Sequence, residues 1–388
     1  MSRRRGAGGV DVCSVVVSDL RYDARVWKQA RALAAAGYGV SLLGFTYEID
    51  GRRERVEGSI RISELPFGSR TKVSRLGRVR SLLALWVATV RTNARVYHCH
   101  NVHPAPAVWL ASRLRGSKFV YDAHELYGDA DDPSSIPQRI AAAVTFRVER
   151  FMIRRSAAVV TTNEARAQVL RERHGREAIV VLPNVPPRIE RIEPIDPGFP
   201  KGVKVLLYQG GIYPQYGIAE AIEAVTLLAG VDLVILGFGR EAELERLRGI
   251  AADHGVADRV HFLGPRPFGE LARTAASADV GLVPIKPLNI NLRLGDTNKI
   301  HDYLMGGLPV VASDLPEIRR VAGSGHPPVG ELFEPESPAS LAAAVERMFA
   351  DDEVYAARRL EARRLALEEY SWESVSPRLI GIYERIGA

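Results

Sequence analysis

Short apolar runs alternate with helix-like segments from one end of the chain to the other, and this alternation limits the fold more than any other feature. In the first half, runs typical of buried strands occupy residues 12–17, 39–45, 96–100, 118–122, 157–161 and 179–182. The second half repeats the pattern at residues 204–208, 231–236, 260–263, 279–283 and 309–312. Such a pattern predicts crossover units, in which parallel strands form a sheet that helices cover on both faces. We therefore expect an α/β protein.

A proline-rich stretch between residues 183 and 202 has no periodic apolar pattern and interrupts the alternation. Because 388 residues exceed the size of one ordinary core, this stretch is expected to be a linker between two domains. The predicted boundaries are 1–185 for the first domain, 186–202 for the linker, 203–370 for the second domain and 371–388 for a C-terminal helix. Both domains are expected to be doubly wound and Rossmann-like, facing a central cleft, with ligands at the carboxyl ends of the strands.

Charge is distributed unevenly along the chain. Residues 1–190 carry 31 Lys and Arg against 18 Asp and Glu, whereas residues 191–388 carry 21 against 28. The segment Arg70–Arg95 holds several arginines, Trp86 and no acidic residue. It is interpreted either as a basic amphipathic helix on an anionic membrane surface or as a crossover helix with a solvated basic rim. No nucleic-acid-binding signature accompanies the charge, so no nucleic-acid partner is expected.

The length of the apolar runs, the cysteine count and the spacing of the histidines limit where the protein can be located and which cofactors it can bind. The longest largely apolar run, residues 82–90, is shorter than the roughly 20 residues of a spanning helix, so a cytoplasmic protein is expected, with a peripheral position on the inner face of the membrane left open. Two cysteines, Cys13 and Cys99, exclude a disulfide scaffold. His98 and His100 share one face of a strand, with His103 nearby, but their spacing fixes no third ligand. Neither a metal nor a cofactor is therefore predicted.

Several segments resemble the family-4 glycosyltransferases of the GT-B fold. The second half carries the segments 207–211, 236–239, 259–264, 278–284 and 297–313 in the family's order and spacing. The first half agrees less densely, through residues 23–26, 98–100 and 120–126. The resemblance implies a retaining enzyme that moves a sugar from a nucleoside diphosphate (NDP) carrier to a hydroxyl group without a metal. It also implies that the helix after Ser371-Trp372-Glu373 crosses back onto the first domain.

The resemblance places the nucleotide sugar on residues of the second half. Backbone amides of the loop Gly210–Gly217 and a helix N-terminus would receive the diphosphate. Lys299 would neutralise charge that builds on the leaving group, and Asp302 would hold the ribose hydroxyls. Relatives carry an Arg and a Lys where this chain has Gly211 and Tyr216, and a Glu where it has Leu294. The full predicted set is Gly210, Gly211, Gly239, Arg266, Thr297, Asn298, Lys299 and Asp302.

In the first half, the resemblance implies that His124 contacts the donor ring, with Glu125 a weaker candidate for catalysis. A loop histidine bonded to the backbone is the structural alternative for His124. Arg25 and His100 are expected on the acceptor or donor side of this domain. The predicted catalytic residues are thus His124, Lys299 and Glu125.

The sequence leaves the base, the sugar, the acceptor and the oligomeric state open. A saccharide, a polysaccharide and a glycolipid are the expected acceptors, and a small natural product is an alternative. An NDP-sugar epimerase could use the same architecture. Gly237-Phe238-Gly239, with Ala242 in the third position, also fits a short nicotinamide-binding pattern, and a non-catalytic glycan-binding relative is the last alternative.

Overall fold

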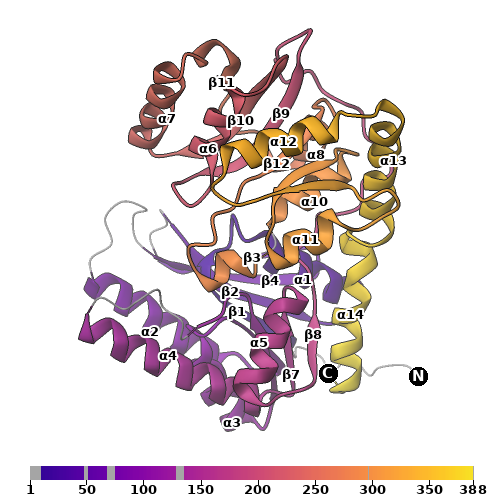
Figure 1. The fold of residues 1–388 in the computed structure, drawn as a ribbon. Helices are drawn as coiled ribbons and strands as arrows, with labels where there is room; N and C mark the ends of the chain where they lie inside the picture. The colour runs from indigo at the N-terminus through magenta and orange to yellow at the C-terminus, as the bar shows by residue number, and fades with distance from the viewer. Residues whose placement is uncertain (1–9, 48–50, 68–74, 128–134, 296, 388) are drawn as a thin grey trace. The chain divides into compact units, whose positions relative to one another are not determined.

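The computed structural model describes residues 10–47, 51–67, 75–127, 135–295 and 297–387 (Figure 1). The chain divides into two compact units, Met1–Pro183 together with Val375–Ala388, and Asn184–Ser374. The proline-rich stretch up to residue 202 forms no helix or strand and belongs to the second unit. Among the described residues, no helix combines the length and the apolar character needed to cross a membrane.

The first unit is built on a sheet of eight strands in the order β3-β4-β2-β1-β5-β6-β7-β8. The strands are β1 (Val10–Asp19), β2 (Val40–Thr46), β3 (Arg53–Glu57), β4 (Ile60–Pro66), β5 (Ala94–His100), β6 (Lys118–Ala123), β7 (Ala158–Thr161) and β8 (Ile179–Val181). The helices that join or cover them are α1 (Ala24–Ala35), α2 (Arg75–Arg91), α3 (Ala105–Arg115), α4 (Ile136–Arg155), α5 (Glu164–His174) and most of α14 (Trp372–Arg385). Strand β1 contributes a fully buried apolar centre, as expected for a parallel strand covered on both faces.

The second unit has a sheet of six parallel strands in the order β11-β10-β9-β12-β13-β14. These are β9 (Lys204–Ile212), β10 (Val231–Gly239), β11 (Val260–Phe262), β12 (Val280–Val283), β13 (Val310–Ser313) and β14 (Gly330–Phe333). The α-helices are α6 (Ile218–Val225), α7 (Glu241–Asp253), α8 (Leu271–Ala275), α9 (Ile290–Arg293), α10 (Asn298–Met305), α11 (Pro316–Ala322), α12 (Pro338–Met348) and α13 (Asp352–Glu368). Two 3-10 turns, Ala257–Arg259 and Phe268–Glu270, complete the unit.

The predicted α/β class is confirmed, and one edge of the first sheet carries a strand pair that the sequence did not predict. Strand β3 pairs antiparallel with β4, and neither strand was expected. In β3, whose sequence is Arg-Glu-Arg-Val-Glu, four of five residues are charged, so an apolar pattern is missing. Strand β14 was also missed, because only its last residue, Phe333, is buried. Charged residues on an exposed edge strand discourage pairing with another chain.

The carboxyl ends of β9 and β10 approach each other unusually closely. Gly237 is the ladder partner of Gly210, and a Cβ at position 237 would lie 1.8 Å from the carbonyl oxygen of Gly210. Gly210 itself has φ +138°, a conformation that side chains rarely adopt. Both positions therefore require glycine.

Replacing Gly237 with Ala should lower the free energy of unfolding of the second unit by about 1–3 kcal/mol, because the methyl group forces the two strands apart. Gly249 is the matched control: it lies inside α7, and a Cβ there meets nothing within 4 Å. Gly249→Ala should raise stability by up to about 1 kcal/mol through helix propensity. Denaturant unfolding measures both, and equal midpoints for the two variants would contradict the close approach.

Candidate functional site

A buried carboxylate lies at the carboxyl edge of the first sheet. Asp122, in β6, has no exposed surface, and its two oxygens accept hydrogen bonds from Arg25 of α1, Nη2 to Oδ1 at 3.0 Å and Nε to Oδ2 at 3.2 Å. Gln29 Nε2 donates to Oδ2 at 2.8 Å. Burial opposes ionisation, but the Arg25 guanidinium and His124 hold the pKa of Asp122 well below its usual range. Asp122 is therefore ionised, and Arg25 lies inside the unit with a relative exposure of 5%.

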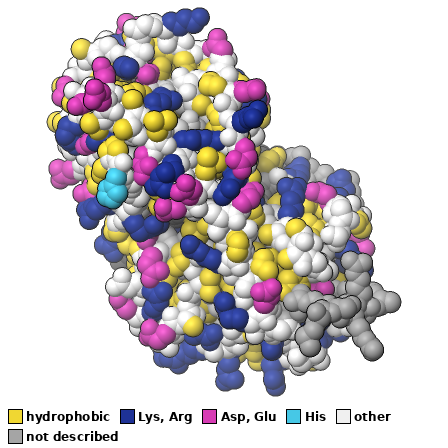
Figure 2. Space-filling model, turned by 90° about the vertical axis from the view of Figure 1, so that its right-hand side faces the viewer, with side chains coloured by type: hydrophobic (Ala, Val, Ile, Leu, Met, Phe, Trp, Pro, Cys, Tyr) yellow, Lys and Arg dark blue, Asp and Glu magenta, His cyan; other side chains and the backbone are white. Residues whose placement is uncertain are grey.

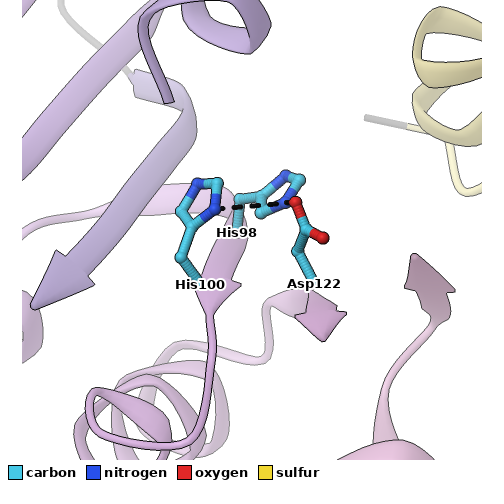
Figure 3. Close-up of side chains that lie close together, drawn as sticks. All are labelled: His98, His100 and Asp122. Atoms are coloured by element: carbon cyan, nitrogen blue, oxygen red, sulfur yellow. Dashed lines mark ion pairs between the residues drawn. The ribbon is translucent and has the colours of Figure 1, made fainter. Parts of the chain in front are cut away.

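Three histidines surround Oδ2 of Asp122, two of them shown in Figure 3. The distances to Oδ2 are 3.5 Å from His98 Nε2, 3.6 Å from His100 Nδ1 and 3.2 Å from His124 Nε2. His98 and His100 alternate along β5, and their rings stack with centroids 4.4 Å apart. The two side chains therefore share a face, as their spacing predicted.

The outer nitrogens of the two strand histidines are also occupied. His98 Nδ1 lies 2.6 Å from the hydroxyl of Tyr383 in α14, and His100 Nε2 lies 2.7 Å from Ser14 Oγ in β1. Burial lowers the pKa of His98, and burial together with His98 lowers that of His100 well below its usual value. Both rings are therefore neutral at neutral pH and serve as hydrogen-bonding groups.

The ligand atoms of His98, His100 and Asp122 lie within 4.8 Å of one another, which is compatible in spacing with a metal site. The carboxylate, however, already binds the Arg25 guanidinium through both oxygens, and a second cation on the same oxygens would be repelled. His103 is exposed and packs near Tyr127 instead. The geometry favours a hydrogen-bonded cluster around one charged carboxylate.

His124 is held in one orientation just after β6. Its backbone N–H donates to Asn101 Oδ1 at 2.9 Å, and its carbonyl accepts from Arg166 Nη1 at 2.5 Å. The side chain is 19% exposed, and its Nε2 faces Asp122. Nε2 thus has an acceptor for its proton while part of the ring stays accessible. The neighbouring Glu125 is exposed and lies outside the carboxylate cluster.

The predicted phosphate loop of the second unit starts later than expected. Strand β9 continues through Gly210 and Gly211 to Ile212, paired with β10 throughout, so the connection to α6 is residues 213–217. The Gly217 amide donates to the Pro284 carbonyl at 2.6 Å, and the Ile218 amide donates to the Tyr216 carbonyl at 2.7 Å. These two amides at the start of α6 are therefore already satisfied.

Lys299, in the first turn of α10, is a buried cation. It is 8% exposed, and its Nζ lies 3.9 Å from the ring centroid of Tyr208 and 4.5 Å from that of Tyr216. Within the part of the chain that the structure describes, Nζ has no hydrogen-bond partner. Burial lowers the pKa of Lys299 to about 7. The two rings stabilise the ammonium, and no described residue forms an ion pair with it.

Lys299 also adjoins Gly210, which lies two residues before the end of β9. A Cβ at Gly210 would lie 3.3 Å from Lys299 Cε and 3.5 Å from Nζ. The absence of a side chain at this position leaves the ammonium next to bare backbone. In the first turn of α10, the Ile300 amide already donates to the Thr297 carbonyl at 3.1 Å. The N-terminal end of a helix nevertheless carries partial positive charge. This corner therefore combines a cation and a helix N-terminus, the elements of an anion site.

The other residues predicted around the nucleotide lie in the same unit. Thr297 occupies the N-cap of α10 without a side-chain cap bond, and the exposed Asn298 accepts a hydrogen bond from Asn184 at 2.9 Å. Asp302 is buried one turn further along α10. Gly239 ends β10, and Arg266 donates through Nη2 to the Pro197 carbonyl at 2.7 Å.

The structure thus brings Gly210 together with Lys299, and Arg25 together with His100 and His124. Sequence reasoning missed the groups that organise these two clusters, which are Asp122, Tyr383, Tyr208 and Tyr216. Asp122 and Tyr208 lie inside segments that supported the resemblance, so a search for charged or aromatic residues within those strands would have found them. The partnership of Tyr383 with His98 joins residues 285 positions apart and has no local signal.

Two family profiles cover most of the chain. The "Glycosyl transferase 4-like domain" matches residues 22–185, and "Glycosyl transferases group 1" matches residues 203–351. The chain belongs to the family-4 glycosyltransferases. It is therefore a glycosyltransferase that uses an NDP-sugar donor.

Relatives of this glycosyltransferase differ in the acceptors that their names record. The 2-deoxystreptamine glucosyltransferase of Streptomyces kanamyceticus is 26% identical over 93% of this chain and 98% of its own length. The phosphatidyl-myo-inositol mannosyltransferase of Mycobacterium leprae is 30% identical, over 49% of this chain and 48% of its own length.

Solved structures support the GT-B fold. Sucrose-phosphate synthase from Thermosynechococcus elongatus aligns with a TM-score of 0.79 and 18% identity, over 97% of this chain and 99% of that one. The Anabaena HepE protein in complex with UDP-glucose aligns with a TM-score of 0.68 and 15% identity, over 97% of this chain and 99% of that one. These alignments confirm the predicted fold class.

If Lys299 receives the diphosphate, as the resemblance implies, donor binding by this glycosyltransferase should weaken as the pH rises through about 7. Below this pH Lys299 is charged before the diphosphate arrives; above it, binding must take up a proton, because the anion favours the ammonium form. The phosphates of a nucleotide sugar are diesters and lack the ionisation near pH 6 of a phosphate monoester, so they do not mask this effect. Calorimetry with UDP-glucose at about pH 6 and about pH 8.5, in buffers of different ionisation enthalpy, measures the affinity and the proton uptake.

Lys299→Met should bind UDP-glucose weakly and with no proton uptake at either pH. The matched control is Lys204→Met, which removes a lysine that is half exposed and paired with Asp279 at 3.5 Å. This control should keep the pH dependence of the wild type. A wild-type affinity that does not change between the two pH values would contradict the assignment of Lys299 as the titrating group.

Proposed function

We propose that this glycosyltransferase moves a sugar from a UDP-linked donor, with retention of configuration and without a metal, to a hydroxyl of a saccharide, polysaccharide or glycolipid acceptor. Residues 1–185 would form the acceptor side, residues 203–370 the nucleotide-sugar side, and residues 371–388 the helix that returns to the first domain. The observation that carries the proposal is the buried Lys299 ammonium, which has two aromatic rings beside it and no anion from the described protein. The Anabaena protein crystallised with UDP-glucose supports uridine as the base.

The chemical problem in this transfer is the negative charge that develops on the departing diphosphate. Lys299 and the N-terminus of α10 would stabilise that charge, with Gly210 leaving room for the phosphate beside the ammonium. Thr297 and Asn298 would flank the phosphate, and Asp302 would orient the ribose. The backbone at Gly211 and Gly239 and the region of Arg266 would surround the nucleotide. A pre-placed ammonium stabilises the leaving group without reorganisation during the reaction.

On the acceptor side, positive charge develops on the sugar ring as the bond to the diphosphate breaks. His124 would contact the donor ring, and the ionised Asp122 behind its Nε2 fixes the proton on that nitrogen. Glu125, exposed beside it, is the weaker candidate for a catalytic role. His100 and Arg25 would then act through the cluster, because both are buried and bonded within it.

A small natural product is the second candidate acceptor. The 2-deoxystreptamine glucosyltransferase, named for a small aminocyclitol acceptor, aligns with this chain over nearly its full length. Product analysis with 2-deoxystreptamine and with a lipid-linked saccharide, each with UDP-glucose, separates the two classes. An epimerase would release an altered nucleotide sugar in the absence of any acceptor.

Lys299→Ala should lower kcat by about 10- to 1000-fold, the range for one lost electrostatic contact to developing charge. Lys204 is the first residue of β9, at the other end of the strand from Gly210. Lys204→Ala should leave kcat unchanged. Steady-state turnover of the donor measures both. Equal turnover of Lys299→Ala and the wild type would remove Lys299 from the mechanism.

His124→Ala should slow transfer while sparing nucleotide binding, because the residue belongs to the first unit. A thermal-shift panel of UDP, GDP, dTDP and ADP should show the largest stabilisation with UDP for both the wild type and this variant. Loss of the UDP shift in His124→Ala would indicate a structural role for the histidine. A larger shift with GDP would overturn the uridine assignment.

A further inference from the structure

Three neighbouring helices of the first unit expose an apolar and basic surface that the proposed sugar transfer does not use. Helices α2 and α4 both pack against α3, and the ring of Trp109 in α3 meets that of Phe151 in α4 with centroids 5.5 Å apart. These helices lie at the lower left of Figure 1. We call their exposed side, which carries Leu83, Val87, Leu114, Ile140 and Val144, the α2–α4 face.

The outward positions of these helices carry apolar side chains where solvated residues are the norm. In α2, Leu83 and Val87 are 51% and 48% exposed, one turn apart. In α4, Ile140 and Val144 are 60% and 51% exposed, with the same spacing. In α3, Leu114 is 66% exposed. An ordinary crossover helix buries one apolar stripe against the sheet, so a second stripe on the outside indicates a partner.

The three helices are also basic. Neither α2 nor α3 contains Asp or Glu, and their exposed side chains include Arg78, Arg80, Arg91, Arg113 and Arg115. In α4 the one acidic residue, Glu149, is fully buried, whereas Arg147 and Arg150 are exposed. By contrast, the side of the molecule in Figure 2 shows acidic and basic side chains interspersed.

We propose that the α2–α4 face binds the surface of an anionic lipid bilayer. The exposed apolar side chains of the three helices would enter the headgroup region, while the surrounding arginines would contact lipid phosphates. The charge complementarity favours lipid over a second copy of this chain, because two such basic faces would repel each other. The cytoplasmic leaflet, which is negatively charged, is the natural partner. From the sequence, only the segment Arg70–Arg95 was interpreted as a possible membrane contact. The structure adds helices α3 and α4 and the exposed apolar side chains to this surface.

The test is flotation of the full-length chain with vesicles of neutral phosphatidylcholine or of phosphatidylcholine containing phosphatidylglycerol. The wild type should float with the anionic vesicles and not with the neutral ones, and high salt should weaken binding. The double variant Leu83→Glu, Ile140→Glu should reduce the bound fraction at least about tenfold, because it places acids in both stripes. Both positions are exposed, so the fold should survive, and the UDP-induced thermal shift checks this for each variant.

The matched control is Leu360→Glu in α13, a leucine that is 75% exposed and lies outside this face. It should float like the wild type. Equal binding to neutral and anionic vesicles, or equal loss in the control and the double variant, would overturn the proposal. A dimer by light scattering that Leu83→Glu, Ile140→Glu converts to a monomer, without lipid binding, would assign the face to a second copy instead. None of these outcomes depends on donor turnover, so they are separate from the tests of sugar transfer.

Discussion

The chemistry proposed for the second unit depends on Lys299, whose ammonium has no hydrogen-bond partner among the residues that the structure describes. A buried cation destabilises a folded protein unless something compensates it, and here two tyrosine rings do so only in part. The cost is visible in the pKa of Lys299, which burial lowers to about 7. In the proposed complex, the diphosphate would lie beside Lys299 and supply the missing negative charge, so a feature that is unfavourable in the free protein would favour donor binding.

The ring of Tyr216 helps to explain how a lysine can be buried at this position. In the loop before α6, the ring of Tyr216 packs on the Lys299 ammonium. A second cation would repel Lys299, whereas the ring stabilises it and holds it in place. In the first unit, the buried charge that organises the cluster is negative. There the ionised Asp122 is compensated by Arg25 and fixes the rings around it, so its charge orients His124.

Much of the fold could be read from local patterns, and the site could be read only in part. The buried apolar runs predicted β12 and β13, because strands covered on both faces are nearly continuously apolar. Strand β3 gave no such signal, since its charged side chains face solvent at an edge. Lys299 and His124 were indicated by family resemblance, but their partners were not, because contacts such as Gly210 with Lys299 join residues that only the folded sheet brings together.

The most direct measurement is the pKa of the Lys299 ammonium itself, followed by NMR of chain carrying isotope-labelled lysine. The chain has only seven lysines, so the Lys299 signal can be assigned by comparison with Lys299→Arg. The account predicts a titration near pH 7 in the free protein and a shift of the midpoint to clearly higher pH with UDP-glucose bound. A midpoint near the ordinary lysine value in the free protein, or one that the nucleotide sugar leaves unmoved, would contradict it.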